Sequence, residues 1–256
     1  MKKYFAIFKY GLKMNTAYII DYLFSIMSFS IHVIVFNGLW DFILKDGSAV
    51  GYTKNELIWY IIMAEFITYS ISRGYKNLSD KVKDGTIANM LLKPISIPMY
   101  FIAEESSNLL KIFLNICAFF ILGACFGGSL EVSLFGILFV ILSVILSIIT
   151  GLVIQLALGL ISFEMEETKS LWFIVQKFQF LVLFVPLEFY NGFIQKILFL
   201  LPTTHIIYAP ARLLVKFSIN EGFKLIGMQV AGIILLSVLS AILYKKGVEK
   251  INANGG

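Results

Sequence analysis

Polar and ionisable side chains recur at helical spacing inside stretches that are otherwise strongly apolar. Glu104, Asn108, Lys111 and Asn115 follow one another every three or four residues, which predicts that they line one face of a helix. Groups of this kind can bind a polar solute, relay an ion, or hold neighbouring helices together by hydrogen bonds. Further candidates in other apolar stretches are Glu65, Gln155, Trp172, Gln176 and Gln179.

Two interpretations of these polar residues fit the sequence equally well. In the first, they line a substrate path or a dimer interface. In the second, they are hydrogen-bonding groups between helices, and the Lys111 ammonium either extends toward the membrane surface or forms a salt bridge with Glu104 or Glu65. Glu65 lies near the middle of its apolar stretch, where a carboxylate costs roughly 3 kcal/mol unless it is paired, solvated or protonated.

The sequence lacks the motifs of common enzymes. It contains no G-x-x-x-x-G-K-[ST] loop for ATP, no H-E-x-x-H zinc motif and no G-x-S-x-G nucleophile elbow. The two histidines, His32 and His205, are far apart in the chain, and we interpret each as a packed, hydrogen-bonded side chain. Cys117 and Cys125 are interpreted as small apolar residues. No catalytic residue and no metal site is therefore expected.

The composition indicates an all-α integral membrane protein. Of the 256 residues, 59% are hydrophobic and only 14% are charged, whereas soluble domains contain about 25% charged residues. A bilayer-spanning helix needs about 20 apolar residues. The apolar stretches predict a single transmembrane domain over 1–256 with six spans, at 22–40, 57–72, 101–126, 132–163, 171–185 and 223–244.

Three segments outside the spans have distinct patterns. Residues 1–18 place lysines around an apolar face, which predicts a helix that lies in the lipid headgroup region. Residues 186–221 are apolar but interrupted by prolines, which favours short re-entrant helices over one continuous span. Most of the 21 Lys and Arg residues lie near the two termini and in 73–98, so the positive-inside rule places both termini in the cytoplasm.

The loop at 73–98 is predicted to form two short amphipathic helices. Tyr75, Leu78 and Val82 share one helical face, and Gly85 follows Asp84 where the first helix should end. A second apolar face begins at Ile87, and Lys93 followed by Pro94 ends it. Such a pair either forms a docking surface for a partner protein or rests on lipid headgroups.

The stretch D-G-T-I-A-N-M-L-L-K-P-I-S-I-P, at 84–98, resembles a segment of type-two ABC exporter permeases. The proline-containing segment P-L-E-F-Y…L-P-T-T-H-I-I-Y-A-P before the last span is also similar to that family. The resemblance extends over the whole chain in the order and spacing of its segments.

This resemblance implies a permease that dimerises with a second copy, identical or different, in a bacterial cell membrane. A separate ABC ATPase subunit, which binds ATP and Mg²⁺, would contact a coupling helix in the first cytoplasmic loop. The resemblance implies no cofactor bound by this chain itself and no nucleic-acid partner. By position, the coupling contact would include Lys83, Asp84, Gly85, Leu91, Leu92, Lys93 and Pro94, with Glu166 and Glu167 of the second cytoplasmic loop contributing less.

The expected function is ATP-driven export of an amphipathic or hydrophobic substrate such as a drug, peptide or lipid. The 24 Phe and 12 Tyr residues suit an apolar cargo, although aromatic residues also pack helix bundles. One alternative is a secondary transporter, which would need an ion or proton site near the midplane, such as Glu65. Another is a membrane assembly protein that transports nothing.

Overall fold

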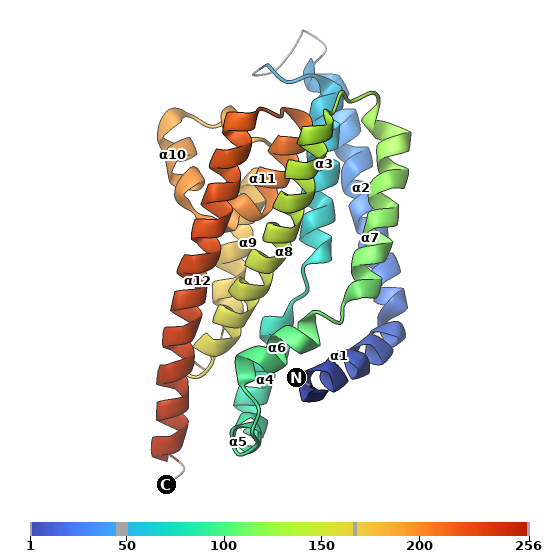
Figure 1. Ribbon diagram of the computed structural model, residues 1–256. Helices are drawn as coiled ribbons and strands as arrows, with labels where there is room; N and C mark the ends of the chain where they lie inside the picture. The colour runs from blue at the N-terminus through green and yellow to red at the C-terminus, as the bar shows by residue number, and fades with distance from the viewer. Residues whose placement is uncertain (1, 45–50, 166–167, 255–256) are drawn as a thin grey trace.

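The computed structural model describes residues 2–44, 51–165 and 168–254, and within these ranges it is helical with no β-strand (Figure 1). This confirms the predicted all-α class. The α-helices are α1 (Lys2–Asn15), α2 (Ile19–Ile43), α3 (Lys54–Ser70), α4 (Gly74–Lys83), α5 (Thr86–Leu91), α6 (Ile97–Glu105), α7 (Leu109–Leu122), α8 (Leu134–Ile161), α9 (Lys169–Leu183), α10 (Gly192–Leu200), α11 (Pro202–Val215) and α12 (Ile219–Asn254).

Four helical stretches of the described residues are long and apolar enough to cross a bilayer: Lys2–Ile43, Leu109–Gly127, Leu134–Ile161 and Ile219–Lys250. A fifth is reached if α10 and α11, which bend by 103° at their junction, count as one span. The predicted second and fifth spans form α3 and α9, of 17 and 15 residues. At 1.5 Å per residue these reach about 26 and 23 Å, which is short of a ~30 Å hydrocarbon core.

The predicted single helix over 132–163 is confirmed, because α8 runs for 28 residues without a break. It packs against α4, α11 and α12. Gln229 of α12 donates from Nε2 to Ser147 Oγ of α8 at 2.9 Å, and Ser143 Oγ donates to Gln229 Oε1 at 2.9 Å. In lipid such hydrogen bonds and close packing hold helices together, because lipid tails are as apolar as the helix surfaces.

The prediction of one helix over 101–126 is wrong. Helix α6 ends at Glu105, and α7 begins at Leu109. Ser107 Oγ donates to the Glu104 carbonyl at 2.6 Å, and Asn108 Nδ2 donates to the Glu105 carbonyl at 3.0 Å. The backbone N–H groups of Ser107 and Asn108 donate to the same two carbonyls at 3.2 Å, so the segment makes tight turns to the residue three positions back, and the side chains reinforce this end of the helix.

Helix α3 lies at the centre of the bundle. It packs against α2, α7 and α11, and every residue from Leu57 to Ile67 except the half-buried Trp59 is buried. A helix that is apolar all round is stable only when neighbours surround it. The outer faces of α2, α8 and α12 instead expose many large apolar side chains, as lipid-facing surfaces do.

Both termini lie at one end of the bundle, together with α4, α5 and α6 (Figure 1). Helix α1 turns away from α2 at Thr16–Tyr18 and runs across this end. Its Tyr4 hydroxyl accepts a hydrogen bond from Ser96 N at 3.0 Å, and Asn15 donates to the Ser107 carbonyl at 2.9 Å. No residue of α1 is buried, and its placement in the headgroup region stays a prediction.

Candidate functional site

Helices α4 and α5 form a tight pair that projects from the end of the bundle (Figure 1). Gly85 joins them with φ +75°, a left-handed conformation that glycine adopts without steric cost. Asp84 Oδ1 accepts a hydrogen bond from Thr86 N at 2.8 Å, and hydrogen bonding by Thr86 lowers the pKa of the Asp84 carboxyl group. The predicted break at Asp84 and Gly85 is confirmed.

The tip of this pair, defined here as residues 83–85 and 92–94, is exposed throughout. It holds six of the seven residues expected to couple to a partner in the first loop. Leu92 is 86% exposed, the largest exposed fraction of any large hydrophobic side chain among the described residues. The seventh, Leu91, is half-buried and packs against the small core beneath α4 and α5. The tip therefore presents an apolar side chain within a polar rim.

Helix α4 is anchored on α8 and α9. Leu78 lies so close to Gly159 of α8 that an added Cβ there would be 2.7 Å from the leucine side chain. The Tyr75 ring lies 5.5 Å from the Trp172 ring of α9, and Tyr75 N donates to Gln155 Oε1 of α8 at 3.3 Å. Close packing and a buried hydrogen bond make α4 move with the membrane helices.

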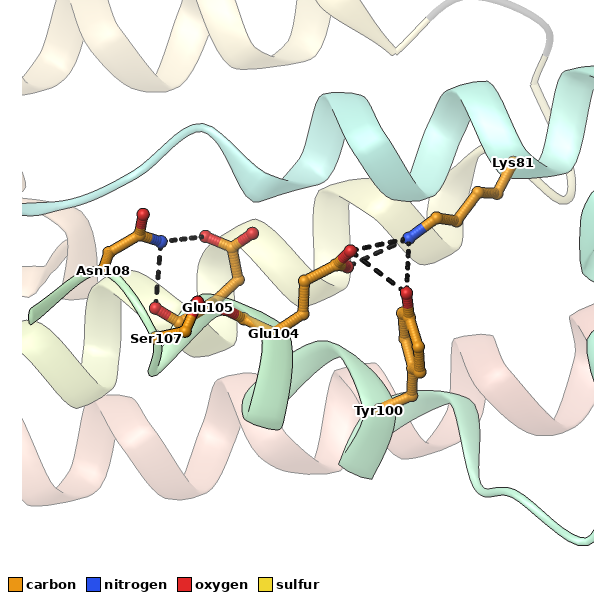
Figure 2. Close-up of polar contacts among 6 residues, drawn as sticks. All are labelled: Lys81, Tyr100, Glu104, Glu105, Ser107 and Asn108. Carbon is orange, nitrogen blue, oxygen red and sulfur yellow. Dashed lines mark hydrogen bonds and ion pairs between the residues drawn. The ribbon is translucent and has the colours of Figure 1, made fainter. Parts of the chain in front are cut away.

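Helix α4 is also tied to α6 by an ion pair. Figure 2 shows Lys81 reaching Glu104 and Tyr100, and its Nζ lies 3.0 Å from Glu104 Oε1 and 3.1 Å from the Tyr100 hydroxyl. Burial lowers the pKa of Lys81, but the charge attraction and hydrogen bonds of Glu104 and Tyr100 together outweigh it, so the net pKa is raised and the ammonium form is favoured. In the same view Asn108 points to Glu105.

The loop between α8 and α9 meets α4 through Thr168, whose hydroxyl donates to Ser79 Oγ at 3.2 Å in a buried contact. Glu164 pairs with Lys250 of α12 at 3.4 Å. Glu166 and Glu167, which were expected to contribute to the partner contact, lie outside the described residues.

Several of the predicted interior polar residues converge on one cavity of about 300 Å³. Lys111 of α7, Gln155 of α8, and Gln176 and Gln179 of α9 all line it. These four residues come from three helices that are distant in sequence. Trp172, which precedes Gln176 by one helical turn, lines the same cavity.

The other interior candidates lie elsewhere, and two expected contacts are wrong. Glu104 is on α6 and pairs with Lys81, because the helix break removes it from the Lys111 face. Lys111 donates to the Ile71 carbonyl at 3.0 Å, and within the described residues no salt bridge joins it to Glu104 or Glu65.

Glu65 instead pairs with His32 of α2, with 2.7 Å between Oε1 and Nδ1. Asn115 is buried against its neighbours, and Asn108 lines a separate, smaller cavity beside Glu105. The predicted polar face is thus divided among an ion pair, a cavity and buried packing contacts.

Sequence patterns did not identify three further polar features. Arg73 lines the cavity of about 300 Å³ that Lys111 and Gln155 also line, called the main cavity below. Its position beside a span suggested only a basic loop. Gln229 is buried between α8 and α11, with no polar neighbour in sequence that would single it out. At the opposite end, Glu188 Oε1 accepts hydrogen bonds from Arg212 Nε at 2.7 Å and from the Tyr208 hydroxyl at 3.0 Å.

Comparison with known protein families yields one match over nearly the whole chain. Residues 27–255 match the model of a family described as "ABC-2 family transporter protein". No curated protein matches the chain. The match agrees with the resemblance of the segments at 84–98 and before the last helix, and with the apolar helices of the fold. The chain belongs to the ABC-2 transporter family, and is therefore a multi-pass membrane component of a transport system.

Proposed function

We propose that this chain is the membrane-spanning subunit of an ATP-driven exporter that works with a separate ABC ATPase subunit. The observation that carries the proposal is the tip of α4 and α5, which exposes Leu92 and is anchored to α8 through Leu78 and Gly159. An exposed apolar residue on a rigid, polar-rimmed projection suits a protein partner. Membership in the family implies an ATPase as that partner.

The proposed topology has six spans. Helices α3 and α9 count as the second and fifth, because α3 packs against α2, α7 and α11, and α9 packs against α3 and α11 within the same bundle (Figure 1). The bent pair α10 and α11 is proposed to dip into the membrane and return. The clustering of lysines near both termini and in α4 favours the cytoplasm for that end of the bundle. The membrane is proposed to be that of a bacterial cell.

In this mechanism, ATP and Mg²⁺ bind to the ATPase subunit and bring its two copies together. The tip is displaced, and α4 transmits the movement to α8 through Leu78 and to the loop at Thr168 through Ser79. Two permease copies, identical or different, then alternate between inward and outward openings. The exposed apolar surface of the bundle supports a hydrophobic or amphipathic cargo that enters from the lipid.

Purification of the tagged chain from native membranes tests this proposal. We expect a soluble protein with a Walker A loop to co-purify with the wild-type chain. Leu92→Glu places an unpaired charge in the contact and should reduce the recovered ATPase at least tenfold, because a buried unpaired charge costs more than about 1.4 kcal/mol. Leu92→Met keeps the apolar contact and should retain the partner. Absence of any such ATPase from the wild-type preparation would contradict the proposal.

The pair of His32 with the buried Glu65 supports one rival function, a secondary transporter driven by an ion or proton gradient. Glu65→Gln keeps the shape of the side chain and removes its charge. If the pair is structural, we expect a loss of about 1–3 kcal/mol of stability, seen as lower yield and lower thermal stability, with unchanged substrate preference. If wild-type protein alone in liposomes transports solute down an ion gradient, and Glu65→Gln abolishes that transport, the rival function is correct.

A further inference from the structure

The main cavity lies where the end of α3 meets α7, α8 and α9. It is lined by Arg73, the residue before the first turn of α4, and by side chains of the membrane helices. Its volume of about 300 Å³ is at the lower end of the range for small-molecule sites. It is therefore large enough for a headgroup-sized ligand at the base of the coupling helix.

The lining of the cavity carries positive charge, and the nearest described carboxylate, Glu105, lies against Gly74 and attracts Lys111 from the neighbouring cavity. Arg73 and Lys111 both line it, and none of its described lining residues is Asp or Glu. Lys111 donates one hydrogen bond, to the Ile71 carbonyl at 3.0 Å, and an ammonium group has three donors. The carboxylate of Glu105 lines the neighbouring cavity and is engaged by Ser72 and Asn108. An anion in the main cavity would meet two cations.

Gln155 provides an independent sign of a missing ligand. Its side chain is 1% exposed, and its Oε1 accepts a hydrogen bond from Tyr75 N at 3.3 Å. Its Nε2 is buried and has no hydrogen-bond partner among the described residues, and the residue lines the cavity. A buried donor left unpaired is costly, so an acceptor that the described residues do not supply is expected beside it. The other polar groups that line the cavity are the hydroxyls of Ser25, Thr68 and Tyr69, the indole of Trp172 and the amides of Gln176 and Gln179.

The cavity also has an apolar wall, formed by Ile71, Ile154, Ile206, Ile207 and the ring of Trp172. We propose that the cavity binds the anionic headgroup, a phosphate, of an amphiphile whose apolar part lies along this wall. Arg73 and Lys111 supply charge, and Gln155 Nε2 donates a hydrogen bond. This inference deepens the proposed function, since it rests on export and names the class of cargo.

The position of the cavity connects its ligand to the coupling helix. Arg73 directly precedes α4, and Gln155 accepts a hydrogen bond from Tyr75 in its first turn. A displacement of α4 therefore moves one cation and changes the orientation of the buried amide. A ligand held by both groups binds one position of α4 better than another, which is the condition for coupling binding to movement.

The test uses equilibrium binding of radiolabelled dodecyl phosphate to the immobilised full-length protein, without ATP. We expect saturable binding that unlabelled dodecyl phosphate displaces and dodecyl maltoside and dodecyltrimethylammonium do not. Arg73→Gln and Lys111→Gln should each weaken binding about tenfold, as expected for the loss of one charge-assisted hydrogen bond in a cavity. Lys111→Arg keeps the charge and should retain most of the affinity.

The matched control is Lys177→Gln on α9, since Lys177 is exposed and lies over the rings of Phe173 and Phe180 away from the cavity. It removes the same charge and should change the affinity less than twofold. Equal weakening by Arg73→Gln and Lys177→Gln would overturn the assigned site. If inorganic phosphate competes as effectively as dodecyl phosphate, the proposal that the ligand is an amphiphile is wrong. This binding assay needs no ATPase. Its failure can therefore be distinguished from a failure to co-purify the ATPase partner.

Discussion

Replacing Gly85 by proline is expected to abolish ATP-driven export while the protein still inserts and folds. Gly85 has φ +75°, and the proline ring fixes φ near −65°, so the turn between α4 and α5 cannot form. The tip would lose its shape, and Leu92 would no longer stand in the position that the proposed contact needs. We expect at least a hundredfold loss of transport in liposomes that contain the permease and its ATPase.

A graded series at this position separates the turn from other effects. Nothing lies within 4 Å of a Cβ added at Gly85, so a side chain there causes no collision, and only the backbone conformation is at issue. Gly85→Asn should retain most of the activity, because asparagine tolerates the left-handed region, and Gly85→Ala should lie between the two. Equal activity of the proline and asparagine variants would show that the shape of the tip is unimportant.

Gly159→Leu is expected to detach the coupling helix from the membrane helices. An added Cβ at Gly159 would lie 2.7 Å from Leu78 Cδ2 and 2.9 Å from Leu78 Cβ, and the latter atom cannot move without its backbone. Overpacking of this kind costs about 1–3 kcal/mol. We expect a lower melting temperature in detergent together with ATP hydrolysis that no longer drives transport.

Two variants make this result specific. Gly227→Leu on α12 adds the same side chain where nothing lies within 4 Å of the Cβ, and it should leave stability and transport unchanged. Adding Leu78→Ala to Gly159→Leu restores space and should recover part of both. If Gly159→Leu lowers stability but transport per folded molecule stays normal, the contact of α4 with α8 stabilises the fold and does not transmit movement.

Composition and periodicity alone predicted the parts of this protein that depend on local physics. Long apolar stretches with few charges require a membrane, which the family and the helices confirm. The break between α4 and α5 follows from the conformational freedom of Gly85, and the unbroken α8 follows from an apolar run without proline. The resemblance of residues 84–98 to exporter permeases also needed no coordinates.

Tertiary structure alone decided which polar residues meet. Helical spacing placed Glu104 and Lys111 on one face, but Ser107 and Asn108 bond to backbone carbonyls and separate them. The partner of Glu104 is on α4, and the partner of Glu65 is on α2. A period of 3.6 residues defines the faces of one helix and carries no information on which faces of distant helices pack together.

The cavity is the clearest case. Lys111, Gln155 and Gln176 are polar interruptions in three separate apolar stretches, and each alone fits a structural hydrogen bond. Their convergence with Arg73 depends on how α7, α8 and α9 pack around the end of α3. Packing of this kind is set by the shapes of many side chains together, so a ligand site made from several helices becomes visible only once those helices are assembled.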